Sequence, residues 1–429
     1  MKQYKTYKDS GVEWIGDIPE HWKLTKIKNV TKIYGRIGFR GYTVQDIVEK
    51  DKGVISLSPS NIKNQKLDIT KGTYISFDKY EESPEIKIFN NDVIFVKTAS
   101  VGKVCFIENL SEPATLNPQL IVFKKIECNK KFLYYVLISE FLNYQIKRDL
   151  VGGVIPTLSQ SVINNYYLNI PPQEEQTQIA NYLNHKTEQL DSLISKKEQL
   201  IQLLQEERTA MINQAVTKGL DPNVPMKDSG IDWLGEIPAH WEVKKLKHVF
   251  KSKNSIRIPL SSEERGKMDS KIYDYYGASG VIDKVENYLF DEELILIGED
   301  GANLLTRSKR LAFIASGKYW VNNHAHIIKP KKGNIYYLCE LLEMLDYSIW
   351  VTGSAQPKLT QEALMSIQLF EPPNNEQDEI YEFIRAESDK INSIIEKSQQ
   401  EIQLLKEYKT ALISEVVTGK VDVRAKITI

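Results

Sequence analysis

The sequence predicts an α+β fold, in which two pseudo-symmetric domains of mixed α/β structure are joined by two long antiparallel coiled-coil helices. Two internal repeats carry this prediction. Residues 9–22, DSGVEWIGDIPEHW, return at 228–241 as DSGIDWLGEIPAHW, and residues 170–176, IPPQEEQ, return at 370–377 as FEPPNNEQ. Repeats of this kind indicate two copies of one unit, each a globular domain followed by a long helix.

The repeats also set the expected domain boundaries. The first pair is offset by 219 residues (9 to 228) and the prolines of the second pair by 201 (171 to 372), so the second copy is shorter between its matching ends. We expect a first globular domain at 1–170 with an N-terminal tag at 7–22, a first long spacer helix at 171–222, a second globular domain at 223–370 with the repeated tag at 226–241, and a second long spacer helix with the C-terminal tail at 371–429.

Both predicted helices carry a heptad stripe. Prolines at 171–172 block helix upstream, and acidic residues follow where the positive end of the helix dipole would lie. The stripe has polar breaks at matching positions of the two copies, 197 with 398 and 208 with 409, which indicates a specified register. The alternative is two separate amphipathic helices, each lying on its own domain. The residues expected at the coiled-coil or subunit interface are Leu183, Leu190, Ile194, Ile201, Leu204, Ile384, Ile391, Ile395, Ile402 and Leu405.

The two middle segments are rich in short β-type runs with turn residues between them. Examples lie at 53–57, 73–77, 119–123 and 325–328. A short helix is expected after each set of strands, at 131–146 and 336–350. Each middle is therefore predicted to be an α+β domain with a curved sheet. The two middles resemble each other only faintly. A duplicated enzyme would be expected to keep its chemistry in both copies, whereas each copy of a duplicated recognition protein can recognise something different.

Charge is sorted along the chain. The net charge is −1, but segments 23–160 and 242–360 have an excess of Lys and Arg, whereas segments 174–221 and 376–422 have an excess of Asp and Glu. This division is expected if the globular parts contact nucleic acid and the helices contact protein or solvent. The plainer alternative is that helix surfaces are simply rich in Glu.

Several function classes lack their motifs. The sequence has no glycine-rich phosphate loop, no complete Asn/Asp-Pro-Pro-aromatic motif of an amino-methyltransferase and no evident nuclease carboxylate cluster. It also has no secretory signal and no apolar run of about 18 residues. Cys105, Cys128 and Cys339 are expected to be free thiols, and the pair His324 and His326 has no third metal ligand nearby. We therefore expect a cytoplasmic protein without a metal site.

Several loop segments mix donor, aromatic and small side chains. Residues 35–42, GRIGFRGY, place two arginines on a glycine-rich loop, and Arg can contact guanine or hold phosphate. Segments 93–103, 275–280 and 303–310 have a similar mixture. The residues predicted to bind DNA are Arg36, Arg40, Tyr42, Lys97, Ser100, Lys103, Tyr275, Tyr276, Ser279, Asn303, Arg307, Lys309 and Arg310.

These motifs resemble those of a known family. WIGDIPEHW at 14–22, repeated at 233–241, resembles the start of each half of the specificity subunits of type I restriction–modification systems. IPPQEEQ at 170–176 looks like the entry to that family's helices, and YGASG at 276–280 and GEDGAN at 298–303 are similar to segments of its target-recognition domains. The resemblance covers nearly the whole chain. The second helix entry, EPPNNEQ at 371–377, departs from the motif.

The resemblance implies a non-catalytic, sequence-specific DNA-binding subunit that serves bacterial defence. Two target-recognition domains would each read one half of a bipartite, asymmetric target in double-stranded DNA, and the helices would hold them apart. The helices would also dock two methyltransferase (M) subunits, and endonuclease (R) subunits would join them. S-adenosylmethionine, Mg and ATP would be bound by those partner subunits only.

Two other classes of function remain open from the sequence. One is a self-contained DNA-modifying enzyme, a nuclease or a methyltransferase, which would require a cofactor or metal motif. The other is a coiled-coil scaffold without a role on DNA, which the positive charge of the middle segments disfavours.

Overall fold

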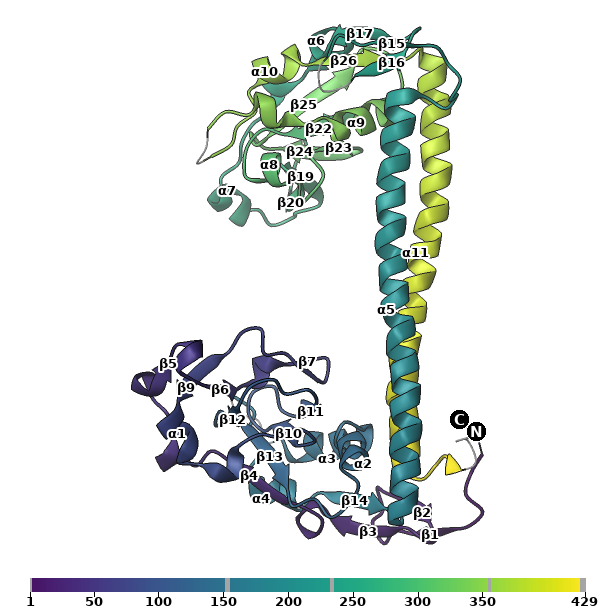
Figure 1. Cartoon of the computed structure of the whole chain (residues 1–429). Helices are drawn as coiled ribbons and strands as arrows, with labels where there is room; N and C mark the ends of the chain where they lie inside the picture. Colours follow the sequence, from purple (N-terminus) through teal and green to yellow (C-terminus); the bar gives the residue numbers. More distant parts are fainter. Residues whose placement is uncertain (1, 151–154, 232–234, 354–355, 425–429) are drawn as a thin grey trace. The chain divides into compact units, whose positions relative to one another are not determined.

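The computed structural model describes residues 2–150, 155–231, 235–353 and 356–424 (Figure 1). Residues 232–234 of the repeated tag and 425–429 of the C-terminal tail therefore lie outside the described residues. The chain divides into two compact units. Unit 1 is Met1–Glu198 with Gln399–Ile429, and unit 2 is Gln199–Ser398. Each unit holds one globular domain and one half of each long helix, α5 (Gln173–Lys218) and α11 (Asn374–Val417).

Two four-stranded sheets form the globular domain of unit 1. The first, ordered β11-β10-β13-β4, is antiparallel throughout, and the second, ordered β12-β6-β9-β5, has β12 parallel to β6. All side chains of β10 are buried, as expected for a strand whose sequence is the continuous apolar run VIFV. The strands are β4 (Lys32–Gly35), β5 (Ile47–Val48), β6 (Gly53–Leu57), β9 (Thr73–Ser76), β10 (Val93–Val96), β11 (Val104–Phe106), β12 (Ala114–Leu116) and β13 (Leu120–Lys124).

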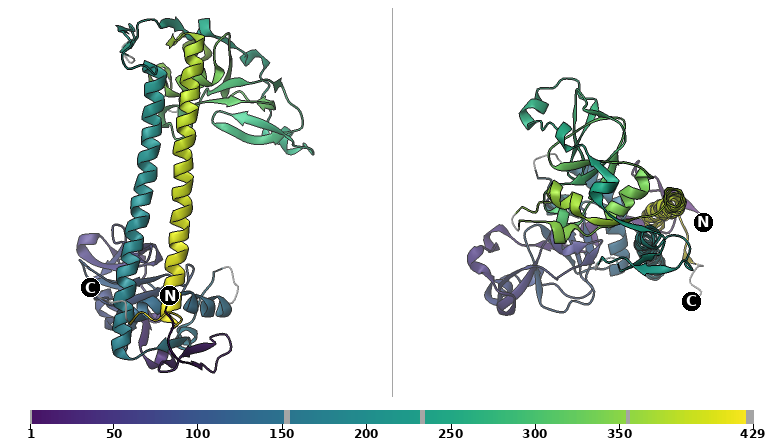
Figure 2. Two further views of the ribbon diagram at one scale, coloured as in Figure 1. Left: turned by 90° about the vertical axis from the view of Figure 1, so that its right-hand side faces the viewer. Right: turned by 90° about the horizontal axis from the view of Figure 1, so that it is seen from above.

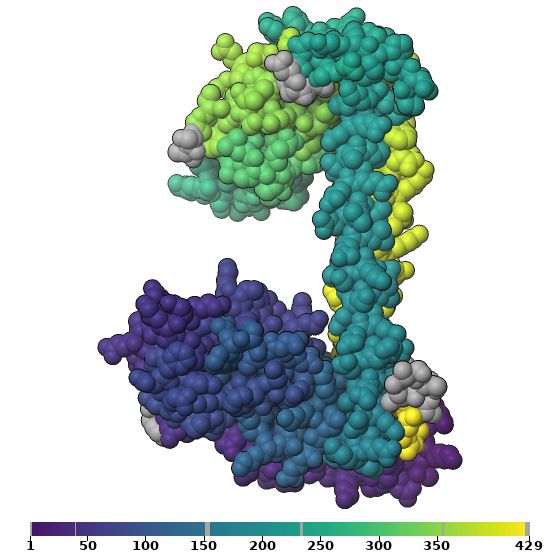
Figure 3. Space-filling view, in the orientation of Figure 1, coloured from purple at the N-terminus to yellow at the C-terminus, as the bar shows by residue number. Residues whose placement is uncertain are grey.

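Alternate residues of the first sheet enter two different cores. Ile94 and Val122 belong to the core between the two sheets, whereas Phe95 and Phe123 belong to a core shared with helices and with the ends of α5 and α11. Figure 3 shows the globular domain of unit 1 packed directly against its helix halves. The remaining elements are β1 (Tyr7–Asp9) paired with β2 (Asp17–Pro19), β3 (Lys23–Lys26) with β14 (Tyr167–Ile170), β7 (Ile62–Lys63) with β8 (Lys66–Leu67), and helices α1 (Phe77–Glu81), α2 (Lys130–Leu137), α3 (Glu140–Asp149) and α4 (Gln160–Asn164).

Unit 2 repeats this architecture. Its sheets have the orders β23-β22-β25-β18 and β20-β19-β24-β21, and β24 is parallel to β19 as β12 is to β6. The predicted fold class, with two pseudo-symmetric α+β domains, is confirmed. The elements are β15 (Met226–Asp228), β16 (Glu236–Pro238), β17 (Glu242–Lys245), α6 (Leu246–Val249), β18 (Phe250–Ser252), α7 (Ser262–Gly266), β19 (Tyr273–Gly277), β20 (Gly280–Val285), β21 (Phe290–Asp291), β22 (Leu294–Gly298), α8 (Asn303–Thr306), β23 (Ala312–Ala315), β24 (Lys318–Val321), β25 (Ala325–Pro330), α9 (Ile335–Met344), α10 (Gln361–Ser366) and β26 (Gln368–Glu371).

The short helices differ from the prediction. The single helix expected at 131–146 is two helices, α2 and α3, because Ser139 caps a new start by accepting a hydrogen bond from the Leu142 amide at 3.4 Å. The helix expected at 336–350 is α9 followed by a 3₁₀ turn at Tyr347–Trp350, whose cap is Asp346. A capping side chain can begin a new helix within an apolar stretch, and hydrophobic periodicity alone does not reveal such a start.

The long helices lie side by side and antiparallel within each unit (Figures 1 and 2). In unit 1, Lys409 of α11 forms an ion pair with Asp191 of α5 at 2.7 Å. In unit 2, Arg208 of α5 donates a hydrogen bond to Asn392 of α11 at 2.6 Å. Residue numbers fall along α11 as they rise along α5, which confirms the predicted antiparallel pairing. The cations of the stripe reach the partner helix with their charged ends, so their aliphatic stems can remain in the seam.

The predicted seam is the buried face of the helix pair. Ile194, Ile395 and Ile402 are each 8% exposed, and the other seven predicted seam residues are buried or half-buried. Apolar residues at other heptad positions are exposed instead, among them Leu203 at 61% and Leu404 at 62%. These heptad positions are therefore less exposed than the apolar positions beside them. No helix among the described ranges is long and apolar enough to cross a membrane.

Each repeated tag anchors its domain to the first turn of a long helix. In unit 1 the Glu175 carboxylate accepts hydrogen bonds from Tyr4 at 2.6 Å and Trp22 at 3.1 Å, and His21 lies 2.7 Å from it. Burial and the bond to Glu175 raise the pKa of Tyr4, so its phenol stays a donor. In unit 2, His240 contacts Glu376 at the same distance of 2.7 Å. The two tag histidines thus make the same structural contact in both units.

Ile402→Ala should lower the free energy of unfolding by about 2–5 kcal/mol, because truncation of this seam side chain leaves a cavity between the helices. Leu404→Ala is the matched control on the same helix. Its side chain is 62% exposed, so the change should stay within about 0.5 kcal/mol. Urea denaturation followed by far-ultraviolet circular dichroism measures both variants. Equal losses in the two would contradict the assigned seam.

Candidate nucleic-acid interface

Four segments of unit 1 meet beside the start of β13. They are residues 36–42, 97–103, 117–119 and 156–158, and together they form the first loop cluster. The Lys97 amide donates to the Gln119 carbonyl at 2.9 Å, the Leu158 amide to the Lys97 carbonyl at 2.8 Å, and the Ala99 amide to the Pro156 carbonyl at 2.9 Å. Three segments that are distant in sequence are therefore fixed by backbone hydrogen bonds alone.

Unit 2 contains the same arrangement in residues 254–260, 299–303, 322–324 and 357–359, the second loop cluster. The Glu299 amide donates to the His324 carbonyl at 2.9 Å, the Leu359 amide to the Glu299 carbonyl at 2.8 Å, and the Gly301 amide to the Pro357 carbonyl at 3.0 Å. The three bonds of one cluster match those of the other within 0.1 Å. The two clusters therefore share one backbone frame, although their side chains differ.

Two sequence signals for these clusters were missed. PTLSQ at 156–160 returns as PKLTQ at 357–361 with the same offset of 201 as the helices. The triplet at 117–119, Asn-Pro-Gln, returns at 322–324 as Asn-Asn-His. In both turns the asparagine Oδ1 accepts the amide of the third residue, at 3.0 Å from Gln119 and 2.8 Å from His324. A search with a variable offset could have found both segments.

An arginine, buried in unit 1 and half-buried in unit 2, ties the first segment of each cluster to the rest. Arg36 is 6% exposed, and its guanidinium donates to the Leu116 carbonyl at 2.9 Å and the Arg40 carbonyl at 3.1 Å. Burial lowers the pKa of Arg36. Arg257 has the corresponding position in unit 2, where it donates to the Ala325 carbonyl at 2.7 Å and to Glu299 at 2.6 Å. Arg36, predicted to touch DNA, is therefore placed as an internal support of the cluster.

The other predicted residues of unit 1 lie in the first loop cluster. Tyr42 is half-buried, and its ring lies 5.4 Å from the Arg36 guanidinium. Arg40 is half-buried and 3.5 Å from Glu85. Lys97, Ser100 and Lys103 all lie on the loop between β10 and β11, and within the ranges that the structure describes neither lysine has an ion-pair partner.

The predicted tyrosines of unit 2 are largely internal. Tyr275 is 1% exposed, and its hydroxyl accepts a hydrogen bond from the Leu260 amide at 3.1 Å, which holds the first segment of the second loop cluster. Tyr276 is half-buried and stacks on Phe313, with ring centroids 6.0 Å apart. Ser279 is half-buried in the turn between β19 and β20. Tyr275 therefore supports the cluster from inside rather than presenting a surface.

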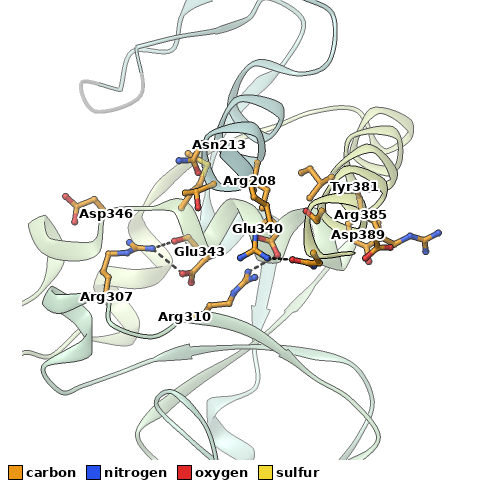
Figure 4. A pocket seen from close by; sticks show the side chains of 16 residues that line it. Arg208, Asn213, Arg307, Arg310, Glu340, Glu343, Asp346, Tyr381, Arg385 and Asp389 are labelled. Atoms are coloured by element: carbon orange, nitrogen blue, oxygen red, sulfur yellow. Dashed lines mark hydrogen bonds and ion pairs between the residues drawn. The ribbon is translucent and has the colours of Figure 1, made fainter. Parts of the chain in front are cut away.

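Arg307 and Arg310 face the long helices and not the second loop cluster. They line a pocket of unit 2 into which side chains of α5, α9 and α11 also project (Figure 4). Arg310 forms an ion pair with Glu340 at 2.8 Å, and Arg307 donates to the Leu345 carbonyl at 2.5 Å. Asn303 closes its own loop by accepting the amide of Lys309 at 2.9 Å, and the Lys309 side chain is exposed. Arg307 and Arg310 therefore bind α9 and the residue that follows it, within their own domain.

His324 and His326 lie two residues apart but have different surroundings. His324 lies in the turn before β25, and its Nδ1 is 2.8 Å from an Asp300 carboxylate oxygen. His326 lies on β25 and is 1% exposed, with Nε2 at 2.7 Å from the Leu359 carbonyl. Burial lowers the pKa of His326. Among the residues that the structure describes, no group of three or more His, Cys, Asp or Glu side chains could hold a metal ion.

Glu299 shows how the second loop cluster tolerates a buried acid. Burial would raise the pKa of this carboxyl, but the hydrogen bond from Arg257 and the contact with Lys358 help to lower it overall. The corresponding residue of unit 1 is Lys97. An opposite charge at an equivalent position means that the two clusters present different surfaces to a ligand.

The fold and the loop clusters define a duplicated recognition protein, with two equivalent frames that carry different side chains. The family model described as Type I restriction modification DNA specificity domain matches residues 19–205 and 238–404. The chain belongs to this family of type I restriction–modification DNA specificity proteins.

Relatives support the assignment over the full length. The chain is 26% identical over 438 residues to the putative type I restriction enzyme MjaX specificity subunit of Methanocaldococcus jannaschii, covering 96% of each chain. It is 24% identical over 439 residues to the MjaIX specificity subunit of the same organism, covering 95% of each. The fold is similar to a chain of a solved type I R-M system (TM-score 0.68, 13% identity, 94% of this chain and 99% of that chain) and to the HsdS subunit from Thermoanaerobacter tengcongensis (TM-score 0.52, 13% identity, 94% and 98%).

Arg36→Ala should destabilise unit 1 by about 2–3 kcal/mol, because it leaves the buried Leu116 carbonyl without its charged donor. Lys103→Ala, an exposed change in the same cluster, should stay within about 0.5 kcal/mol of the wild type. Urea denaturation measures both. Wild-type stability combined with altered DNA sequence preference in Arg36→Ala would instead place Arg36 at the DNA surface.

Proposed function

We propose that this chain is the specificity subunit of a type I restriction–modification enzyme, and that each loop cluster reads one half of a bipartite, asymmetric DNA target. The observation that carries the proposal is the shared backbone frame of the two clusters combined with their different side chains. Because both clusters have the same backbone frame, each can approach a DNA duplex in the same way. Different side chains on that frame give two different half-sites.

Within each cluster the cations with access to solvent are the candidates for phosphate contact. In the first loop cluster these are Lys103, which is exposed, and Lys97, which is half-buried. In the second, Lys358 is 53% exposed and lies 3.3 Å from Glu299, so it can hold a phosphate beside a carboxylate that Arg257 already neutralises. Arg40, Tyr42 and Ser100, with Ser279 and Lys309 in unit 2, remain proposed DNA contacts.

The exposed apolar side chains of the helices are proposed to dock the methyltransferase (M) subunits. In unit 1 these are Leu193, Leu404 and Tyr408, and in unit 2 they are Leu200, Leu203, Phe383 and Ile394. They lie outside the seam, so the helix pair does not use them. Endonuclease (R) subunits would join this complex in the cytoplasm, where the DNA is. S-adenosylmethionine, Mg and ATP are proposed to bind the partner subunits, and this chain is proposed to bind none of them.

Lys103→Ala should weaken binding to all DNA sequences alike, because a phosphate contact carries no base information. In the complex with the M subunit, the slope of log affinity against log salt should become shallower by about 0.9. Lys125→Ala is the matched control, an exposed lysine just beyond the far end of β13 from the cluster. It should leave affinity and slope unchanged. A loss in Lys103→Ala confined to some sequences would contradict a phosphate role.

The chain purified without partners should neither methylate nor cleave DNA, because we assign all chemistry to the partner subunits. Addition of the M subunit and S-adenosylmethionine should produce methylation at a bipartite sequence, detected by sequencing modified bases. Methyl transfer by the rigorously purified single chain would contradict the assignment and favour a self-contained enzyme.

A further inference from the structure

The turn that leads into the central strand holds one side chain at the same position in each unit. This residue is Gln119 before β13 and His324 before β25. Its amide is bound by the asparagine two residues earlier, and its carbonyl accepts the amide of Lys97 or of Glu299 at 2.9 Å. The backbone is therefore held on both sides, and the side chain starts from a fixed point.

A neighbour also orients the far end of each of these side chains. The Asn117 Nδ2 donates to Gln119 Oε1 at 3.0 Å, which sets the amide plane and leaves both hydrogens of Gln119 Nε2 for another partner. In unit 2 the Asp300 carboxylate holds His324 Nδ1, with oxygens at 2.8 and 2.9 Å, and leaves Nε2 for another partner. Asp300 itself is fixed by its β-bridge to Lys358.

Both side chains reach solvent, as a contact with DNA requires. Gln119 is half-buried, and the side chain of His324 is 48% exposed. The asparagines of the two turns are 9% and 5% exposed and are the same residue in both units, so they cannot distinguish two half-sites. Glu299 is occupied by Arg257 and Lys358. The turn residue is the position where exposure, fixed geometry and a difference between the units coincide.

The chemistry of the two side chains suggests different bases. A glutamine amide matches adenine in the major groove, where Nε2 donates to N7 and Oε1 accepts from N6. The free Nε2 of the histidine can make one hydrogen bond to a base edge. We propose that Gln119 and His324 are equivalent specificity-determining side chains, one for each half-site, and that Gln119 contacts an adenine. This proposal rests on the proposed function.

The test exchanges the two residues in the full chain, assembled with its M subunit. Gln119→His and His324→Gln are each used to select binding sites from duplexes with both half-sites randomised. Gln119→His should change the preference at one base pair of one half-site by about 5- to 150-fold, with loss of an adenine there, and leave the other half-site profile as in the wild type. His324→Gln should change the preference at one base pair of the other half-site and leave the profile of the first half-site as in the wild type. The unchanged half-site also reports that the variant is folded and assembled.

His248→Gln is the matched control, since it makes the same chemical change at an exposed residue of unit 2, on α6 and outside the second loop cluster. Both of its half-site profiles should equal those of the wild type. The assignment is overturned if the wild type selects two half-sites and both exchanges keep every base preference. It is also overturned if both exchanges abolish all binding, since reading one base is not needed for assembly. Absence of any sequence preference in the wild-type complex would instead refute the proposed function.

Discussion

Each globular core is completed by the ends of both long helices, and this shared burial is the constraint on which the rest of the structure depends. In unit 1 the core contains Leu183 near the start of α5 and Val416 near the end of α11. In unit 2 it contains Ile384 near the start of α11 and Val216 near the end of α5. A helix end that belongs in sequence to the other copy therefore supplies apolar area to each domain. Neither copy of the repeat is a complete folding unit.

The polar anchors follow from that constraint. Each long helix begins beside a tag, so the carboxylate in its first turn lies within hydrogen-bond distance of the tag histidine. The negative charge of this carboxylate is also favourable at the positive end of the helix dipole. The two anchors are not equal. Trp22 donates to Glu175, whereas Trp241 stacks on Phe370 at 5.2 Å and its Nε1 has no hydrogen-bond partner among the described residues. The tryptophan N–H group is therefore hydrogen-bonded in the first anchor and not in the second, which favours the stability of the first.

Sequence periodicity predicted the parts of the fold that depend on local spacing. The heptad stripe placed Ile194 and Ile402 in the seam, because burial at every third or fourth position leaves a trace in the sequence. It did not show which domain each helix end completes, because a stripe identifies a face and not its partner. The break at Ser139 was missed for a related reason, since a cap depends on one hydroxyl and interrupts no apolar pattern.

The candidate site was harder to predict, because its geometry depends on contacts between distant segments. Arg36 and Tyr275 are of residue types that often contact ligands. In this structure, however, Arg36 donates to the Leu116 carbonyl and Tyr275 accepts from the Leu260 amide. Gln119 and His324 were not predicted as DNA contacts, because their position is defined by bonds to residues more than 20 positions away, Lys97 and Glu299. Loop composition showed where donors gather but not which of them are already occupied.

The pair Lys97 and Glu299 shows how a duplicated frame can diverge without losing its shape. Both residues contribute the same two backbone hydrogen bonds, which do not depend on the side chain. The side chain can therefore change sign, provided that its new surroundings compensate the charge. Arg257 and Lys358 supply that compensation in unit 2. Backbone bonding separates the architecture of the clusters from their surface chemistry, and this separation lets two copies of one domain acquire different specificities.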